Sequence, residues 1–263
     1  MERLRGVLRG VLGWDSRAYR FGAELLNLVS LIRIEGLATT RTLLHLRSAS
    51  PGGSARAINF ARLAYPFFIR PGTKDVTVAI NNFVREEYGA VIHVLQPRLL
   101  VDGGAYIGDT SAYFLSRYPS LRSIALEPME DNLKIAGRKL AFYGELVELL
   151  SLALTAGGAR VHMSGVETGA PVSDSGCVEV PSTTIAQILS SLPEGRIDIL
   201  KLDIEGAEGP IFAQQPEAWL PYVDSIIVET HGPAITTTVL DALDRNGWIA
   251  ERHRNLYFCC PTV

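Results

Sequence analysis

The sequence predicts an α/β protein in which a mostly parallel sheet is wound with helices and preceded by a helical segment. From Arg98 onward, short β-branched or leucine-rich runs alternate with helical patterns, as in parallel sheets. Two strand-like runs close the chain and predict an antiparallel hairpin. Before Arg98, apolar residues recur at roughly helical spacing. With 263 residues, 47% of them hydrophobic, the chain can bury one packed domain and still carry an appended segment.

Seven strands are expected in the sheet. The five parallel ones are Leu99–Asp102, Ser123–Glu127, Val147–Leu150, Ile197–Asp203 and Ser225–Glu229. The last two are Trp248–His253 and Leu256–Cys260, joined by a tight turn around Arg254 and Asn255. A dinucleotide-binding Rossmann fold does not usually end in such a hairpin, so the pattern predicts a Rossmann-like variant of it.

Helical patterns lie between most of these strands. They are Thr110–Arg117, Asp131–Phe142, Thr184–Leu192, Ile211–Trp219 and Ile235–Arg245. Asn246 and Gly247 follow the last pattern and are residues that commonly end a helix. We therefore expect helices to cover the faces of the sheet.

Residues 1–70 are predicted to form a basic, mostly helical segment, and residues 71–263 the α/β domain. Ala18–Arg47 predicts two or three helices, broken near Gly36. Ser48–Ala55, rich in Pro, Gly and Ser, predicts a loop at the expected boundary. Pro66–Gly72 predicts a short strand that ends in a turn, and Asp75–Tyr88 a helix that leads into the sheet.

The charge is distributed unevenly along the chain. Met1 to Gly72 holds eleven arginines and four acidic residues, a formal charge of +7, so the remainder carries −10. The net charge of −3 gives no reason to expect a nucleic acid partner. The arginine-rich helices form either a cap or dimerisation arm, which would make a homo-oligomer, or a peripheral contact with an anionic membrane. We favour the cap, because a charge run is usually a solvated face.

The cysteines and the N-terminus indicate a reducing compartment. Cys259 and Cys260 are adjacent and Cys177 is isolated, which fits neither a disulfide framework nor a zinc-ligand spacing. Arginines interrupt every apolar run at the N-terminus, unlike a secretory signal, and no stretch of about eighteen apolar residues occurs. We expect a cytoplasmic protein, membrane-associated only if the basic N-terminus binds lipid.

The run VDGGAYIGDT, residues 101–110, predicts a nucleoside-binding loop between a strand and a helix. Its glycines are Gly103, Gly104 and Gly108. Glycine lets the backbone approach a ligand, and a helix N-terminus presents free N–H groups. Glu127 ends the next strand, where a carboxylate can accept hydrogen bonds from both hydroxyls of a ribose. Asp102 and Asp109 would repel a diphosphate, whereas Asp102 suits a ligand with an ammonium group and a sulfonium charge.

A second constellation follows the fourth and fifth strands. IDILKLDIEGAE places Asp203 and Glu205 at a strand end, and VETHG places Glu229 and His231 at the next. In an open α/β sheet these ends face the ligand crevice, so the four side chains should converge. Taken singly, each charged residue also has an ordinary interpretation. Glu208 begins a helix, Lys201 pairs with Glu205 or Glu229, and His231 caps a turn.

These motifs together resemble the FkbM family of S-adenosylmethionine-dependent methyltransferases, which mostly methylate oxygen on sugars or on glycosylated and polyketide natural products. The resemblance rests on DGGAYIG, EPMEDN, VPSTTIAQIL, KLDIEGAE and the ExH of VETHG. RPGTKD, Arg70 to Asp75, resembles a segment that precedes the domain in part of that family. The resemblance implies a class I methyltransferase fold, S-adenosylmethionine as cofactor and a small-molecule or glycan acceptor. The family commonly has Asn where this chain has Tyr106.

Site residues follow from the resemblance position by position. It implies that Asp102, Gly104 and Gly108, with the adjoining Gly103, hold the methionine portion of the cofactor. Glu127 would bind the ribose and Asn132 would make a nearby contact. The adenine would lie beside Ser151 and Leu152. In some related sugar methyltransferases acids at the fourth and fifth strand ends hold Mg²⁺, and these would be Asp203 and Glu229.

The hypothesis for the chemistry is transfer of the sulfonium methyl to a hydroxyl oxygen by in-line displacement. Holding the acceptor opposite the sulfur supplies much of the rate enhancement. His231 is the first candidate for the base, because its ordinary pKa is near 6.5. Glu205 is the second, with Asp203 beside both. A metal ion would instead lower the pKa of the hydroxyl.

Two other functions share some of these features. An NAD-dependent sugar oxidoreductase would have the glycine loop and the acid after the second strand, but it predicts a G-x-G-x-x-G loop and a Tyr-x-x-x-Lys pair, which this sequence lacks. A non-catalytic protein that retains a methyltransferase fold is the other alternative, since a fold alone does not establish activity.

Overall fold

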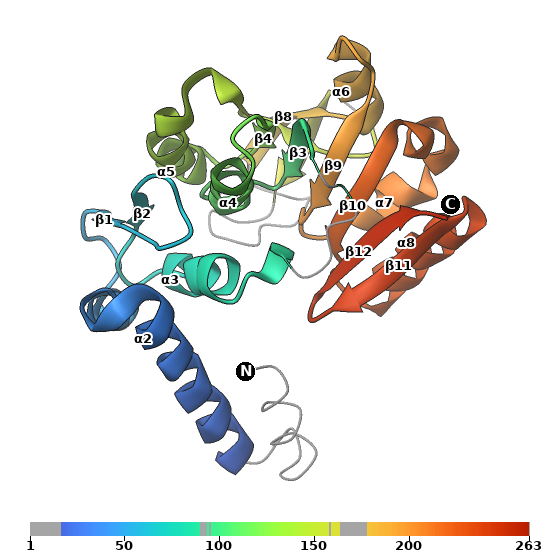
Figure 1. The fold of residues 1–263 in the computed structure, drawn as a ribbon. Coiled ribbons are helices and arrows are strands. Elements are labelled where there is room, and N and C mark those ends of the chain that lie inside the picture. Colours follow the sequence, from blue (N-terminus) through green and yellow to red (C-terminus); the bar gives the residue numbers. More distant parts are fainter. Residues whose placement is uncertain (1–16, 90–93, 95, 158, 164–177, 263) are drawn as a thin grey trace. The chain divides into compact units, whose positions relative to one another are not determined.

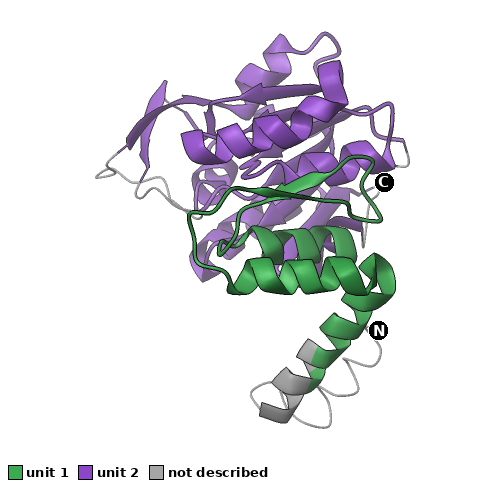
Figure 2. Ribbon diagram, turned by 90° about the vertical axis from the view of Figure 1, so that its left-hand side faces the viewer, with its two compact units in different colours: residues 1–86 green, residues 87–263 purple. Residues whose placement is uncertain are grey.

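In the computed structural model the chain divides into two compact units, residues 1–86 and residues 87–263 (Figure 2). The structure describes residues 17–89, 94, 96–157, 159–163 and 178–262. The expectations for the first sixteen residues and for Cys177 lie outside that range.

The first unit begins with the long helix α2, Arg17–Ser48. Gly36 breaks it with a φ of 79° and a ψ of 166°, which confirms the predicted interruption. Strands β1, Arg56–Ile58, and β2, Phe67–Ile69, pair antiparallel, so the short strand predicted before Gly72 is also confirmed.

The helix predicted over Asp75–Tyr88 is shorter in the structure. It forms α3, Asp75–Ala79, and continues as a π-helical turn, Ile80–Val84. Glu86 then takes a left-handed φ of 49°, which ends the helical path before the 3-10 turn Glu87–Gly89 of the second unit.

Aromatic packing and one buried ion pair hold the first unit together. Phe60, Phe67 and Phe83 meet edge to face, with ring centroids 4.8 to 6.4 Å apart. Asp75 is fully buried and accepts hydrogen bonds from the backbone N–H and the guanidinium of Arg70.

Helix α2 leaves several apolar side chains exposed, among them Leu25, Val29 and Leu37. A membrane contact or a dimerisation arm would each use such a surface, and both stay predictions. Among the described residues, no helix has the length and apolar character needed to cross a membrane.

The second unit is built on a seven-stranded sheet in the order β11-β12-β10-β9-β3-β4-β5 (Figure 1). Its strands are β3 Leu99–Gly103, β4 Arg122–Leu126, β5 Val147–Leu150, β9 Ile197–Leu202, β10 Val223–Glu229, β11 Trp248–His253 and β12 Leu256–Pro261. Pairing is parallel from β5 to β10, and β12 runs antiparallel to both β10 and β11. The predicted mostly parallel sheet with a closing hairpin is confirmed.

Five helices connect the strands. They are α4 Asp109–Arg117, α5 Glu130–Leu140, α6 Ile185–Ser191, α7 Glu208–Ala213 and α8 Pro233–Arg245. Helix α4 contacts α5, and α7 packs against α8. Crossovers in parallel sheets are right-handed, so the helices that follow β3 and β4 lie on the face opposite α7 and α8 (Figure 1).

The prediction of one helix over Ile211–Trp219 was wrong. Helix α7 ends at Ala213, Gln215 has a left-handed φ of 50°, and a 3-10 turn starts at Pro216. Proline has no N–H to continue an α-helix, so the path restarts there. The remaining short helical turns are Ala141–Leu146, Pro216–Ala218 and Leu220–Tyr222.

A small three-stranded sheet is not among the elements expected from the sequence. It consists of β6 Ala153–Leu154, β7 Arg160–Met163 and β8 Val178–Thr183, in the order β6-β8-β7. The predicted helix after it, α6, begins with a capping box in which Thr184 and Gln187 exchange hydrogen bonds.

Candidate active site

The candidate site lies where the chain order of the sheet reverses. Strand β3 has β4 on one side and β9 on the other. From β3 the chain continues outward to β4 and β5, and from β9 it continues in the opposite direction to β10. Ligands of open α/β sheets bind at this point, beyond the carboxyl ends of the strands. Asp102 and Lys201 are paired across β3 and β9, and the N–H of Asp203 donates to the carbonyl of Gly103. The glycine loop and the KLDIEGAE block therefore meet.

Lys201 supports the glycine loop from inside the protein. Its ammonium lies 3.2 Å from Asp102 Oδ1 and donates to the carbonyls of Gly103 and Gly104 at 3.2 and 2.7 Å. Burial by itself lowers the pKa of Lys201, but the carboxylates of Asp102, Asp203 and Asp109 outweigh burial and raise it. Lys201 therefore stays charged and pairs with Asp102, not with Glu205 or Glu229 as the sequence suggested.

Asp102 is fully buried within this network. Besides Lys201, it accepts a hydrogen bond from the hydroxyl of Ser111 at 2.7 Å, and Ser111 is bonded in turn to Ser123. The carboxylate thus fixes the start of α4 against β3 and β4. Its predicted contact with the methionine portion of the cofactor stays a prediction.

The glycines of the loop are also required by close packing. A Cβ on Gly104, whose φ is 73°, would lie 1.9 Å from the carbonyl oxygen of Asp203. On Gly108, whose φ is 77°, it would lie 2.9 Å from Leu140, and on Gly103 it would lie 2.8 Å from Leu154. The loop can adopt this path only without side chains at these positions.

Glu127 follows β4 and is nearly buried. It accepts hydrogen bonds from the N–H groups of Tyr106 and Met129 at 2.9 Å, and a longer one from Asn132 at 3.4 Å. Burial raises the pKa of Glu127 to about 6, against these donors, which lower it. A carboxylate has about four acceptor positions, so one is left for a ribose hydroxyl and the long bond to Asn132 can give way to a second.

The other predicted cofactor residues adjoin this carboxylate. Ser151 and Leu152 directly follow β5, and the N–H of Glu127 donates to the carbonyl of Leu150 at 3.1 Å. Asp109 is buried at the start of α4, and burial, together with Asp102, raises its pKa to about 7. The charged side chains among these residues are all acidic, which suits the positively charged S-adenosylmethionine better than the anionic diphosphate of a dinucleotide.

A cluster of acids surrounds His231 at the ends of β9 and β10. Its Nε2 lies 3.3 Å from Glu205 Oε2 and 3.7 Å from Asp203 Oδ1, while its Nδ1 lies 3.1 Å from Glu208 Oε1. The bond to Glu208 is the largest cause that raises the pKa of His231 to about 9, assisted by Glu205 and Asp203 and opposed by burial. The predicted convergence of Asp203, Glu205 and His231 is what the structure shows.

Glu208 holds this cluster in place. It is fully buried at the first turn of α7 and accepts hydrogen bonds from the N–H groups of Ile204 and Gly206 at 2.9 Å, besides contacting His231. The interpretation that Glu208 begins a helix is confirmed. Its contact with His231, 23 residues away, has no direct signal in the sequence. The only indirect one is that a buried acid needs a hydrogen-bonding partner.

Glu229 ends β10 beside the cluster. Burial, followed by the neighbouring charge of Asp203, raises its pKa to about 7. Three other residues, Asp203, Glu205 and His231, can each offer one ligand atom within 4.8 Å of the others. The predicted metal pair of Asp203 and Glu229 stays a prediction.

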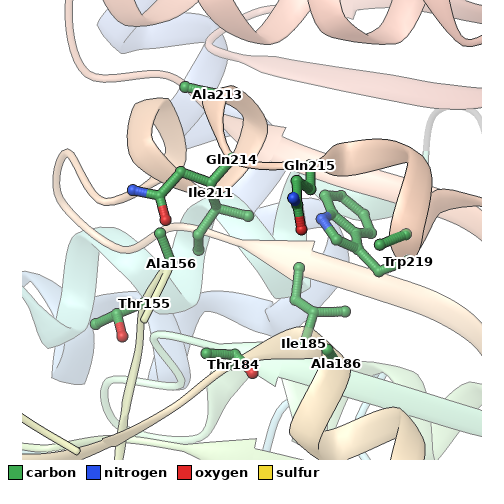
Figure 3. Close-up of a pocket in the computed structure, with 11 residues that line it drawn as sticks. Thr155, Ala156, Thr184, Ile185, Ala186, Ile211, Ala213, Gln214, Gln215 and Trp219 are labelled. Atoms are coloured by element: carbon green, nitrogen blue, oxygen red, sulfur yellow. The ribbon is translucent and has the colours of Figure 1, made fainter. Parts of the chain in front are cut away.

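A separate cavity of about 500 Å³ lies between α6, α7 and the residue pair after β6 (Figure 3). Its lining includes Thr155, Thr184, Ile185, Gln215 and Trp219, and none of its lining residues is titratable. None of the predicted cofactor or catalytic residues lines it. Helix α7 nevertheless connects the two places, because it begins at Glu208 and its residue Ile211 lines the cavity.

Comparison with known proteins agrees with this geometry. The sheet order, the closing hairpin and the acidic strand ends define a class I S-adenosylmethionine-dependent methyltransferase. Residues 102–252 match the model of the methyltransferase FkbM domain. Since the match spans more than half of the chain, the protein belongs to the FkbM family. Among curated proteins no relative matches the chain.

Several solved structures are similar at low sequence identity. Precorrin-6y C5,15-methyltransferase from Geobacter metallireducens is 14% identical, with a TM-score of 0.43 over 71% of this chain and 87% of its own. An S-adenosylmethionine-dependent O-methyltransferase from Thermotoga maritima is 12% identical, with a TM-score of 0.42 over 80% and 79%. Ribosomal protein L11 methylase from Lactobacillus delbrueckii is 13% identical, with a TM-score of 0.38 over 69% and 74%. These proteins are too distant to indicate a substrate.

Proposed function

We propose that this methyltransferase methylates a hydroxyl oxygen on a sugar, a glycolipid or a glycosylated natural product. The observation that carries the proposal is the cluster of Asp203, Glu205 and His231, which lies beside the glycine loop and combines acids with an imidazole. A hydroxyl acceptor must lose its proton during transfer, and such a cluster supplies the groups for that step.

The cofactor-binding residues in the proposal are those of the loop and of the next two strand ends. Glu127 would hold the ribose, with Asn132 beside it, and Ser151 and Leu152 would border the adenine. S-adenosylmethionine, when bound, supplies the electrophilic methyl group. The protein orients it and keeps the loop rigid through the buried ammonium of Lys201.

The acceptor side of the proposal belongs to the cluster. His231 is held by Glu208 so that its Nε2 points toward Asp203 and Glu205. Because the pKa of His231 is raised to about 9, its imidazole accepts the proton of the hydroxyl only in its neutral form, and Glu205 next to it would otherwise receive that proton. Side chains fixed in this way orient the acceptor, which is the larger part of the barrier reduction in a displacement by an already activated methyl donor.

The experiment that tests the proposal combines cofactor binding with methyl transfer. Calorimetry with S-adenosylhomocysteine and with NAD should show binding of the first alone, followed by a transfer screen over saccharides and small phenols. His231→Ala should lower turnover by about 10²-fold or more while the affinity for S-adenosylhomocysteine stays nearly constant. His162→Ala, an exposed position in β7, is the matched control.

Three results would contradict the proposal in different ways. Equal turnover in His231→Ala would remove His231 as the base. Transfer to nitrogen or carbon acceptors alone would reject O-methylation. Binding of neither ligand would favour a non-catalytic protein with a methyltransferase fold.

A further inference from the structure

The three side chains at the end of β9 and β10 have the composition of a first-row metal site. They offer one imidazole nitrogen and two carboxylate oxygens, all within 4.8 Å of one another. Imidazole suits zinc, cobalt and iron, whereas Mg²⁺ prefers sites made of oxygen ligands alone. The donor set therefore does not fit the Mg²⁺ that related sugar methyltransferases suggest.

The distances within the cluster agree with a single ion. Ligands at about 2.1 Å from a zinc-like ion lie about 3.0 to 3.4 Å from each other. His231 Nε2 lies 3.3 Å from Glu205 Oε2, inside that interval, and 3.7 Å from Asp203 Oδ1. Both distances from the imidazole nitrogen are therefore within a few tenths of an ångström of the spacing that a shared ion requires, and the two carboxylate oxygens lie within 4.8 Å of each other.

Glu208 provides a second and independent feature of a metal site. Ligating histidines almost always bond their other ring nitrogen to a carboxylate, a carbonyl or a water, which fixes the tautomer and the ring orientation. Here the fully buried carboxylate of Glu208 lies 3.1 Å from Nδ1 and is itself held by two backbone N–H groups. This arrangement holds a proton on Nδ1, so Nε2, which faces the two acids, is the nitrogen that can exchange its proton for a metal ion.

The exposure of the cluster indicates an open site and not a closed structural one. The side chains of His231, Asp203 and Glu205 are 26%, 30% and 37% exposed. Three protein ligands on an ion that prefers four or more leave a position for water or for an oxygen of a bound molecule.

We propose that Asp203, Glu205 and His231 bind one first-row divalent metal ion, such as Zn²⁺, Co²⁺ or Mn²⁺, with Glu208 as the positioning residue of His231. Binding of the ion follows from these side chains alone. Its use, to hold the acceptor hydroxyl and lower that hydroxyl's pKa in place of a protein base, rests on the proposed function.

The test is metal binding by the full chain, without a histidine tag and after treatment with a chelator. Co²⁺ is titrated while its visible absorption and the heat of binding are followed, and Mg²⁺ is titrated in parallel. We expect one equivalent of Co²⁺, bound at least about tenfold more tightly than Mg²⁺, with an absorption spectrum that indicates nitrogen ligation.

Variants locate the site. His231→Asn and Glu205→Gln should each weaken Co²⁺ binding by about a hundredfold. His162→Asn should leave it unchanged, since this exposed residue of β7 is remote in the sequence and belongs to the other sheet. Circular dichroism and S-adenosylhomocysteine binding establish that each variant is folded. If His231→Asn does not fold, Glu205→Gln still tests the site.

Absence of Co²⁺ binding at about millimolar concentration would overturn the proposal. Wild-type Co²⁺ affinity in both His231→Asn and Glu205→Gln would also overturn it, because the ion would then be bound elsewhere. Co²⁺ binding without any binding of S-adenosylhomocysteine would support the metal site and reject the methyltransferase activity. The two proposals can therefore fail separately.

Discussion

Replacing Lys201 with Met is the most informative perturbation of the cofactor loop. The substitution keeps most of the volume of the side chain but removes the ammonium from a site where both it and Asp102 are almost completely buried. The carboxylate of Asp102 would keep Ser111 as its hydrogen-bond donor, and the carbonyls of Gly103 and Gly104 would each lose one.

The expected cost follows from what is left unpaired. Removing one partner of a buried ion pair costs about 3–5 kcal/mol, mainly because the other charge stays buried without compensation. The two lost hydrogen bonds from a charged donor would add to this if they were independent, but they involve the same ammonium. We therefore expect Lys201→Met to lower the free energy of unfolding by about 3–5 kcal/mol.

Urea unfolding followed by circular dichroism measures this change. Lys134→Met is the matched control, because Lys134 is exposed on α5, and it should shift the free energy of unfolding by less than about 0.5 kcal/mol. In the double variant with Asp102→Asn, the cost should be smaller than the sum of the two single costs by about 1 kcal/mol or more. A cost for Lys201→Met below about 1 kcal/mol, or strict additivity, would refute the buried pair as the support of the loop.

Three further predictions concern the loop and the carboxylate of Glu127 that adjoins it. Gly104→Ala should cost more free energy of unfolding than Gly144→Ala, although both glycines have a positive φ. Of these two positions, only Gly104 would place the new Cβ against a backbone oxygen, that of Asp203, and equal costs in urea unfolding would contradict the packing argument. The raised pKa of Glu127 means that its ionisation opposes folding, so this group's contribution to stability should fall by about 2 kcal/mol as pH rises from 4.5 through 6, a decline that Glu127→Gln should lack. The affinity for S-adenosylhomocysteine should instead rise with pH, because ribose hydroxyls donate hydrogen bonds to the ionised carboxylate. Calorimetry should find binding that weakens by up to about tenfold per pH unit below 6 in the wild type, but not in Glu127→Gln.

The fold could be predicted because its signals are local. Strands β3, β9 and β10 are mostly apolar, and a glycine or an acidic residue stands at the end of each or directly after it, namely Gly103, Asp203 and Glu229. The small sheet of β6, β7 and β8 could not be predicted, because β6 has only two residues and β7 pairs with β8 across a long separation in the sequence, from Met163 to Val178.

The positions of the candidate residues at the strand ends could be predicted, but their partners could not. The sequence placed Asp102 and Lys201 at strand ends 99 positions apart, and only the register of β3 against β9 brings them together. The departure at Tyr106 has a backbone explanation. Tyr106 has a left-handed φ of 49°, a conformation in which Asn is enriched. The Asn common at this position in the family is therefore explained by the turn, without a contact to the ligand.

The spacing of the KLDIEGAE block follows from the four tasks that its charges perform. Lys201 lies within β9, with its side chain beneath the glycine loop, and Asp203 comes directly after the strand with its N–H on that loop. Glu205 occupies the turn with a left-handed φ of 53°, and Glu208 begins α7 and fixes His231. One strand end thus supports the cofactor loop on one side and orients the acid and imidazole cluster on the other. A change at Glu208 should therefore alter acceptor chemistry, and a change at Lys201 should alter cofactor binding. The six residues between them set the distance from one to the other.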